Sequence, residues 1–148
     1  KEVKMAGEWK VYAAWQNTGR AVVLVREDEM LTILLENMLK PAFDETMQKA
    51  VAYINENLAN DLSIHNISKS INVSKSVLYK KFHTCFHCTV SEYINTRRVE
   101  KSIELLSKTD LSMEEISGKV GFSSTSYYTK IFKKQKGLAP LKYKKLML

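Results

Sequence analysis

Residues 110–137 read DLSMEEISGKVGFSSTSYYTKIFKKQKG, and this stretch decides how the chain folds. Apolar residues with helical spacing lie on both sides of Val120-Gly121-Phe122. The glycine in that turn can adopt a positive φ, which other residues reach only at a cost. A short helix, a turn of about three to four residues and a second helix ending in Phe132 make a helix-turn-helix, whose second helix can enter the major groove of DNA.

The same pattern occurs earlier in the chain. Positions in 62–74 recur 49 residues later, with Ser74 opposite Ser123. After a one-residue insertion, the offset becomes 50 residues and Phe82 recurs as Phe132. Two copies of one supersecondary unit are the simplest explanation of this repeat.

We therefore predict an all-α domain at 44–148 that contains two helix-turn-helix subdomains. The first subdomain spans about 62–86 and the second about 111–136. Between them, VSEYINTRRVEKSIELLSK has the pattern of a long amphipathic helix at about 90–107, which would join the two. Upstream, FDETMQKAVAYINENL (43–58) has a single apolar helical face.

The first 43 residues differ from the rest of the chain. EWKVYAAW (8–15) and AVVLVRE (21–27) are short β-prone runs, and the turn residues between them predict a small β-hairpin. Asp28 could cap a helix that follows the hairpin. A lone hairpin and helix are too small to be stable alone. Because the sequence also begins with Lys1, we expect residues 1–43 to be the tail of a larger upstream sensory domain and a linker.

Composition indicates a chain with a packed core and an anionic partner. Of the 148 residues, 45% are hydrophobic, which is enough for a core. The net charge of +7 is unevenly distributed, because from Lys69 onward 16 basic side chains stand against 6 acidic ones. A segment this basic attracts nucleic acid or an anionic membrane, although a solvated lysine-rich surface is the alternative. With only Cys85 and Cys88 present, a disulfide framework is excluded and a reducing cytoplasm is the expected location.

The stretch GFSSTSYYTKIFKKQKGLAPLKY (121–143) resembles the signature of the AraC/XylS-type transcription regulators. The resemblance covers about residues 44–146 and includes YINTRRVEKSIELL (93–106) in the joining helix. It implies seven helices in two helix-turn-helix subdomains held apart by a rigid central helix. The activity that it implies is sequence-specific binding of double-stranded DNA, with recruitment or blocking of RNA polymerase.

The length of the joining helix agrees with DNA binding. A helix over 90–107 has 18 residues and would be about 27 Å long. The flanking turns would bring the two recognition helices to roughly 34 Å apart, which is one turn of B-DNA. Both helices could then read successive major grooves on the same face of the duplex.

Two sets of side chains are candidates for DNA contact. Leu78 with Phe82, and Tyr128 with Phe132, should face the cores, so the opposite faces of the two recognition helices are free for DNA. The base-contact candidates, which on the first helix match the family's base-reading positions, are Ser76, Tyr79, Lys80, Thr125, Ser126, Thr129 and Lys130. Lysine can donate to guanine, and the threonine methyl can pack on thymine. The phosphate-contact candidates, which would fix register, are Lys75, Lys81, Lys133, Lys134 and Lys136. The alternative is that these are merely solvated helix residues, and Arg98 in the joining helix is expected to brace the structure.

Residues 82–88 read FHTCFHC and invite comparison with a metal site. On a helix, however, His83 and Cys85 point about 200° apart, so their donor atoms do not converge. His87 stands where the second copy has Gly137, and it could adopt a left-handed turn there only at a higher cost than glycine. Cys88 is expected to be a buried thiol that behaves as a small hydrophobe. The stretch is therefore predicted to be the end of a helix, with no metal bound.

Other functions fit the sequence less well. We find no catalytic triad, paired carboxylates, phosphate-binding loop or metal-ligand spacing, so neither enzyme activity nor a cofactor is expected. The main alternative is a basic helical module that docks an acidic protein such as RNA polymerase, which a weaker dependence on salt would reveal. Membrane binding requires a long basic amphipathic helix with exposed aromatic residues. The sequence has no such pattern, so membrane binding is not expected. Any dimerisation would use the upstream domain.

Overall fold

A computed structural model describes residues 9–16, 19–26 and 44–148 of the chain. In the first two ranges, strands β1 (Trp9–Gln16) and β2 (Gly19–Arg26) pair antiparallel, with Trp9 opposite Arg26 and Gln16 opposite Gly19. The helix predicted to follow Asp28 lies outside the described residues. The assignment of residues 1–43 to an upstream domain and a linker stays a prediction.

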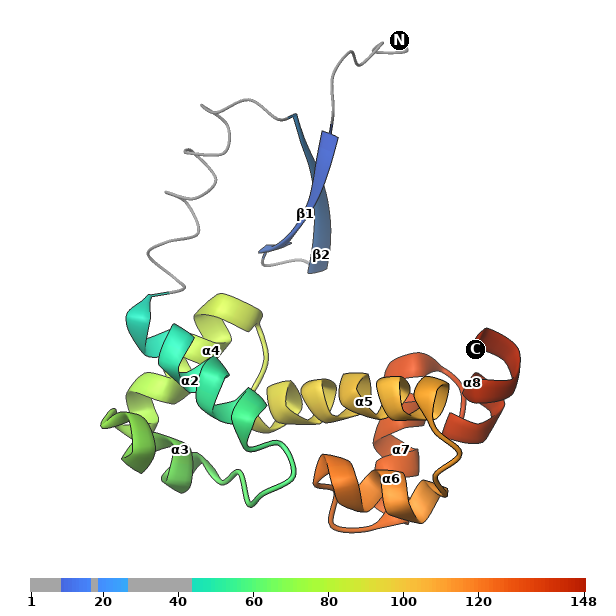
Figure 1. Cartoon of the computed structure of the whole chain (residues 1–148). Coiled ribbons are helices and arrows are strands. Elements are labelled where there is room, and N and C mark those ends of the chain that lie inside the picture. The colour runs from blue at the N-terminus through green and yellow to red at the C-terminus, as the bar shows by residue number, and fades with distance from the viewer. Residues whose placement is uncertain (1–8, 17–18, 27–43) are drawn as a thin grey trace, which may run out of the picture.

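Residues 44–148 form an all-helical domain, as predicted. Its seven helices are α2 (Glu45–Glu56), α3 (Ile64–Ile71), α4 (Lys75–Phe86), α5 (Val90–Lys108), α6 (Met113–Val120), α7 (Thr125–Lys136) and α8 (Pro140–Met147). Figure 1 shows α2, α3 and α4 gathered at the beginning of α5, and α6, α7 and α8 at its far end. The long central helix therefore runs from one group of three helices to the other.

Local sequence explains where these helices begin. Side chains at the N-caps of six helices accept a hydrogen bond from the backbone N–H three residues later: Asp44, Ser63, Ser74, Thr89, Ser112 and Ser124. Each such cap contributes about 1 kcal/mol. In α5 and α6, Glu92 and Glu115 complete capping boxes by accepting from the N-cap backbone N–H. Helix α8 has no side-chain cap and begins instead with Pro140, which suits the first helical position.

Four helices end at a residue with a positive φ. The two short helices α3 and α6 end at Asn72, with φ 54°, and Gly121, with φ 98°. The recognition helices predicted from the sequence, α4 and α7, end at His87, with φ 51°, and Gly137, with φ 79°. His87 thus adopts the left-handed turn that the sequence left open.

One detail of the predicted repeat is wrong. The N-cap of α7 is Ser124, so the structural partner of Ser74 is Ser124 and not Ser123. The extra residue of the second copy therefore lies in the turn before α7. Two adjacent serines follow the turn, and the helix is capped by the second of them.

The hydrophobic core is divided into two clusters along α5. Helices α2, α3 and α4 bury the first cluster against Val90 and Ile94 of α5. Helices α6 and α7 bury the second cluster against Val99 and Leu106. Phe82 and Phe132 are fully buried, and each lies edge-on to a tyrosine, with ring centroids 5.3 Å apart in both clusters. Each group of helices therefore has a core of its own. Burial of one aromatic side chain of this size contributes about 1.5–3 kcal/mol to its stability.

Candidate nucleic-acid interface

Helix α4 presents a polar face away from its buried residues. Leu78 and Phe82 are fully buried. Successive residues of a helix are about 100° apart, so Ser76 and Lys80 point to the side opposite Leu78. Both are exposed, and Tyr79 beside them is 53% exposed although it is aromatic. The structure therefore brings the three base-contact candidates of this helix to its solvent-facing side.

Helix α7 repeats this arrangement around Tyr128, which is fully buried. Ser126 and Lys130 are exposed and point to the opposite side of the helix. Thr129 is only half-buried, at the edge of that face. Thr125 differs, because its hydroxyl oxygen lies 3.2 Å from that of Ser117 in α6. The contact holds the two helices of the motif together, so Thr125 has a structural partner in addition to its predicted role.

The candidate phosphate ligands do not all have the same surroundings. Lys75, Lys133, Lys134 and Lys136 are exposed. Lys81 is half-buried and forms an ion pair with Asp44, the N-cap of α2. This hydrogen bond from Lys81 is the main reason that the pKa of Asp44 is lowered, and the backbone N–H of Met47 adds to the effect. The charge of Lys81 is thus already matched within the domain, whereas the four other lysines carry theirs into solvent.

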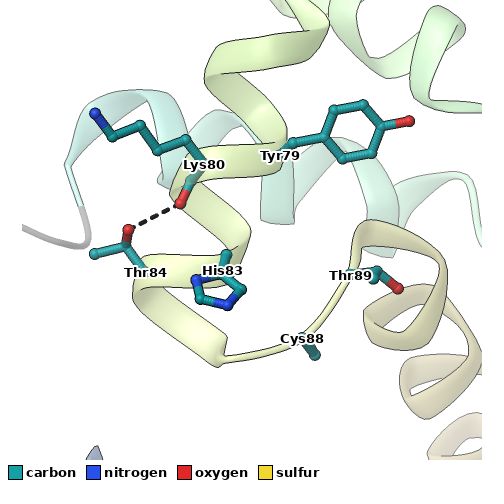
Figure 2. A pocket seen from close by; sticks show the side chains of 6 residues that line it. All are labelled: Tyr79, Lys80, His83, Thr84, Cys88 and Thr89. Carbon is teal, nitrogen blue, oxygen red and sulfur yellow. Dashed lines mark hydrogen bonds between the residues drawn. The ribbon is translucent and has the colours of Figure 1, made fainter. Parts of the chain in front are cut away.

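A shallow depression of about 530 Å³ lies beside α4 where the chain turns into α5. Tyr79, Lys80, His83 and Thr84 line it from α4, and Cys88 and Thr89 complete it. Figure 2 shows Tyr79 and Lys80 projecting to different sides of α4, with the hydroxyl of Thr84 donating to the Lys80 carbonyl at 2.9 Å. The depression is thus continuous with the polar face of the first predicted recognition helix.

His83 is a candidate contact that the sequence reasoning missed. It is exposed and lies on the face of α4 that carries Ser76 and Lys80. The 50-residue offset of the repeat pairs it with Lys133, one of the candidate phosphate ligands. The repeat contained this signal, but His83 was considered only as a metal ligand.

The two thiols near the end of α4 are both half-buried. Burial raises the pKa of Cys85, which packs against the first core, and burial also raises the pKa of Cys88. A protonated thiol is a poor metal ligand. In residues 9–16, 19–26 and 44–148, no three or more His, Cys, Asp or Glu side chains are grouped as a metal site would require.

Arg98 lies in α5 and points into the domain. Its Nε donates to the carbonyl of Leu58 and its Nη2 to the carbonyl of Asn60, both at 3.0 Å. The expectation that this residue braces the backbone is confirmed.

No helix among the described residues has the length and apolar composition needed to cross a membrane.

Comparisons with known proteins agree on one kind of domain. The family model described as "Helix-turn-helix domain" matches residues 67–146. The Msm operon regulatory protein of Streptococcus mutans is 32% identical over an alignment of 124 residues, which covers 79% of this chain and 45% of that protein. The chain spans less than two thirds of the length of this and other curated relatives.

Two solved structures share the fold. The C-terminal domain of AraT, a response regulator from Geobacillus stearothermophilus, has a TM-score of 0.68 and 26% identity, over 72% of this chain and 88% of that one. The DNA-binding domain of AdpA, a global transcriptional factor solved in complex with a target DNA, has a TM-score of 0.65 over 69% of this chain and 92% of that one. At 22% identity, AdpA is evidence for the fold alone.

Proposed function

The chain belongs to the AraC/XylS-type family of DNA-binding transcription regulators, and from this premise we propose that α4 and α7 are its two recognition helices. Each helix would enter a major groove, and the two grooves would be successive on one face of a duplex. The family is one of transcription regulators and not a class of enzymes. Because genomic DNA is the proposed partner, we place the chain in the cytoplasm.

The observation that carries the proposal is the repeated outer face of α4 and α7. Ser76 and Lys80 on α4 correspond to Ser126 and Lys130 on α7 at the 50-residue offset, and all four are exposed. Each pair lies in the N-terminal half of its helix and opposite the buried residues, where a recognition helix meets base edges. The lysines would donate to guanine O6 and N7, and the hydroxyl groups can serve several bases.

The length of α5 supports the distance between α4 and α7 that binding to successive major grooves requires. The helix has 19 residues, which is about 28 Å at 1.5 Å per residue. With the turns at either end, the centres of two half-sites would be about 10 base pairs apart. Lys75, Lys133, Lys134 and Lys136 are exposed around the two helices and would contact phosphates.

A second candidate function is docking of an acidic protein such as RNA polymerase. It is favoured by α8, where Leu141, Leu146 and Met147 are each more than 60% exposed among lysines. Apolar side chains of this kind suit a protein surface better than a DNA groove. The two functions can coexist, since a regulator that binds DNA also meets the transcription machinery.

The test of DNA recognition is selection of bound duplexes from a random pool, followed by titration at several salt concentrations. We expect two separate half-sites, and an affinity that falls steeply with salt because several phosphates release counterions. Recovery of one compact site shorter than a helical turn would contradict the two-helix proposal. Binding with little salt dependence and no sequence preference would favour the protein-docking alternative.

A further inference from the structure

Arg98 contacts both groups of helices. It lies in the middle of α5, between Ile94 of the first cluster and Val99 of the second. Its guanidinium group donates to the carbonyls of Leu58 and Asn60, in the loop that joins α2 to α3. The same group lies 5.9 Å from the centre of the Phe122 ring, in the turn that joins α6 to α7. One side chain therefore contacts both groups of helices.

The turn of the second motif approaches the loop of the first closely at Gly121. A Cβ atom added at Gly121 would lie 2.1 Å from the Leu58 carbonyl oxygen, far inside any permitted contact. The same atom would lie 3.0 Å from Nε and from Nη2 of Arg98. The Leu58 carbonyl thus fits between Arg98 and a residue that has no side chain. We call this arrangement of Leu58, Asn60, Arg98 and Gly121 the clasp.

Without the clasp, the two groups of helices would be joined mainly through α5. Within 44–148, α5 is the element that contributes to both hydrophobic clusters. A single helix as the connection resists stretching but permits bending and rotation of one group about its axis. A second attachment away from that axis, made of charge-assisted hydrogen bonds to fixed carbonyls, opposes such rotation.

We propose that Arg98 and Gly121 are positioning residues, which fix the relative orientation of α4 and α7 and thereby make the chain selective for the spacing of its two half-sites. This inference rests on the proposed function, since spacing has meaning only if both helices bind DNA. Neither residue needs to touch DNA in this role. Arg98 is half-buried with two of its nitrogen atoms engaged by the backbone, and Gly121 has no side chain.

The test measures affinity as a function of spacing. Duplexes carry the two selected half-sites with their centres moved apart or together in steps of one base pair, and further duplexes carry each half-site alone. We expect the unmodified chain to have a sharp optimum. Arg98→Ala should bind each isolated half-site within about threefold of the unmodified chain, because only one distant charge is lost. Its affinity for the best spacing should fall about tenfold or more, since loosely joined modules lose effective concentration, and its optimum should broaden.

Arg97→Ala is the matched control. Arg97 is the neighbouring residue of α5 and carries the same charge, but it donates to Asn55 of α2 and pairs with Glu100 of its own helix. Its contacts do not reach the second group of helices, so its loss should preserve the sharp optimum. Arg98→Lys keeps the charge and can still reach one carbonyl, so it should restore part of the preference, and it decides the question if Arg98→Ala does not fold.

Gly121→Ala tests the close approach itself. Its control is Gly137→Ala, because Gly137 also has a positive φ but has nothing within 4 Å of the added Cβ. Both substitutions carry the strain of a left-handed alanine, whereas only Gly121→Ala pushes the two groups of helices apart. We therefore expect both variants to lose stability, and only Gly121→Ala to change the preferred spacing.

The possible failures are distinguishable. An unmodified chain that binds single half-sites without any preference for spacing would contradict the proposed function. A spacing profile of Arg98→Ala or Arg98→Lys identical to that of Arg97→Ala, in a chain that does have an optimum, would overturn the clasp proposal alone. A profile of Gly121→Ala that matches Gly137→Ala would do the same for Gly121.

Discussion

At the scale of single residues, His87 shows how the chain departs from its own repeat. It adopts φ 51° and ψ 33° at the end of α4, where the corresponding residue at the end of α7 is Gly137. A left-handed conformation costs an ordinary residue about 1–2 kcal/mol. Glycine avoids this strain. Its greater conformational freedom in the unfolded chain, however, lowers the stability of the folded state by about 0.5–1 kcal/mol. The surroundings of His87 therefore specify a conformation that its side chain does not favour.

We predict that His87→Gly increases the free energy of unfolding by about 0.5–1 kcal/mol, because the strain that is relieved exceeds the added entropy of the unfolded chain. Urea denaturation followed by circular dichroism would measure the change. Asn72→Gly is the control, because Asn72 has a similar φ of 54° but asparagine tolerates that region. Its gain should be smaller, and a His87→Gly variant that is less stable than the unmodified chain would show that His87 makes contacts worth more than its strain.

At the scale of helices and turns, the sequence predicted what is determined locally. The buried pair Leu78 and Phe82 follows from a short-range pattern that the chain carries within a few residues. The hydrophobic spacing also predicted the central helix nearly to its ends.

Contacts between distant residues could not be predicted in this way. The clustering of lysines makes Lys81 a candidate phosphate ligand, and nothing near it in the sequence reveals its ion-pair partner Asp44, which is 37 residues away. Arg98 was expected to brace the backbone, but its acceptors are carbonyl groups about 40 residues away, and backbone carbonyls have no signature in a sequence. Such partners decide which lysines remain available for DNA. The candidate interface could therefore be defined only from the folded structure.

The proposed recognition helix α7 offers a test that separates base contacts from phosphate contacts. Lys130 is exposed one turn after Ser126, on the side opposite Tyr128. If it donates to a guanine, Lys130→Ala should cost about 1–3 kcal/mol on the selected duplex and relax the preference at one base position. The measurement is a pair of titrations, on selected and scrambled duplexes, at several salt concentrations.

Lys134→Ala is the matched variant for this experiment. Lys134 is exposed one turn further along α7, and its charge helps to lower the pKa of Glu92, which is set mainly by the Thr89 cap at the start of α5. Its loss should weaken binding to both duplexes alike and reduce the salt dependence by about one unit. Equal behaviour of the two variants would mean that Lys130 contacts phosphate and that α7 is docked differently.

At the scale of the whole molecule, residues 44–148 combine two separate cores with a connection through α5 and Arg98. The two hydrophobic clusters have no residue in common, and α5 passes from one to the other. The clasp around Arg98 lies between them and is made of hydrogen bonds to backbone rather than of buried apolar surface. Each group of helices should therefore have a stability of its own, whereas the contact between the groups should set their relative orientation.

This division predicts where the protein opens when one core is weakened. Phe132→Leu should destabilise the second group by about 1–2 kcal/mol, as removal of part of a fully buried ring typically does. Because local opening follows local stability, amide hydrogen exchange should become faster in α6, α7 and the end of α5, with little change in α3 and α4. Phe82 is equally buried at the equivalent position, so Phe82→Leu should produce the opposite pattern. Exchange that rises throughout both groups in either variant would show that the two cores unfold as one unit, and α5 would then transmit stability as well as orientation between the two halves of the domain.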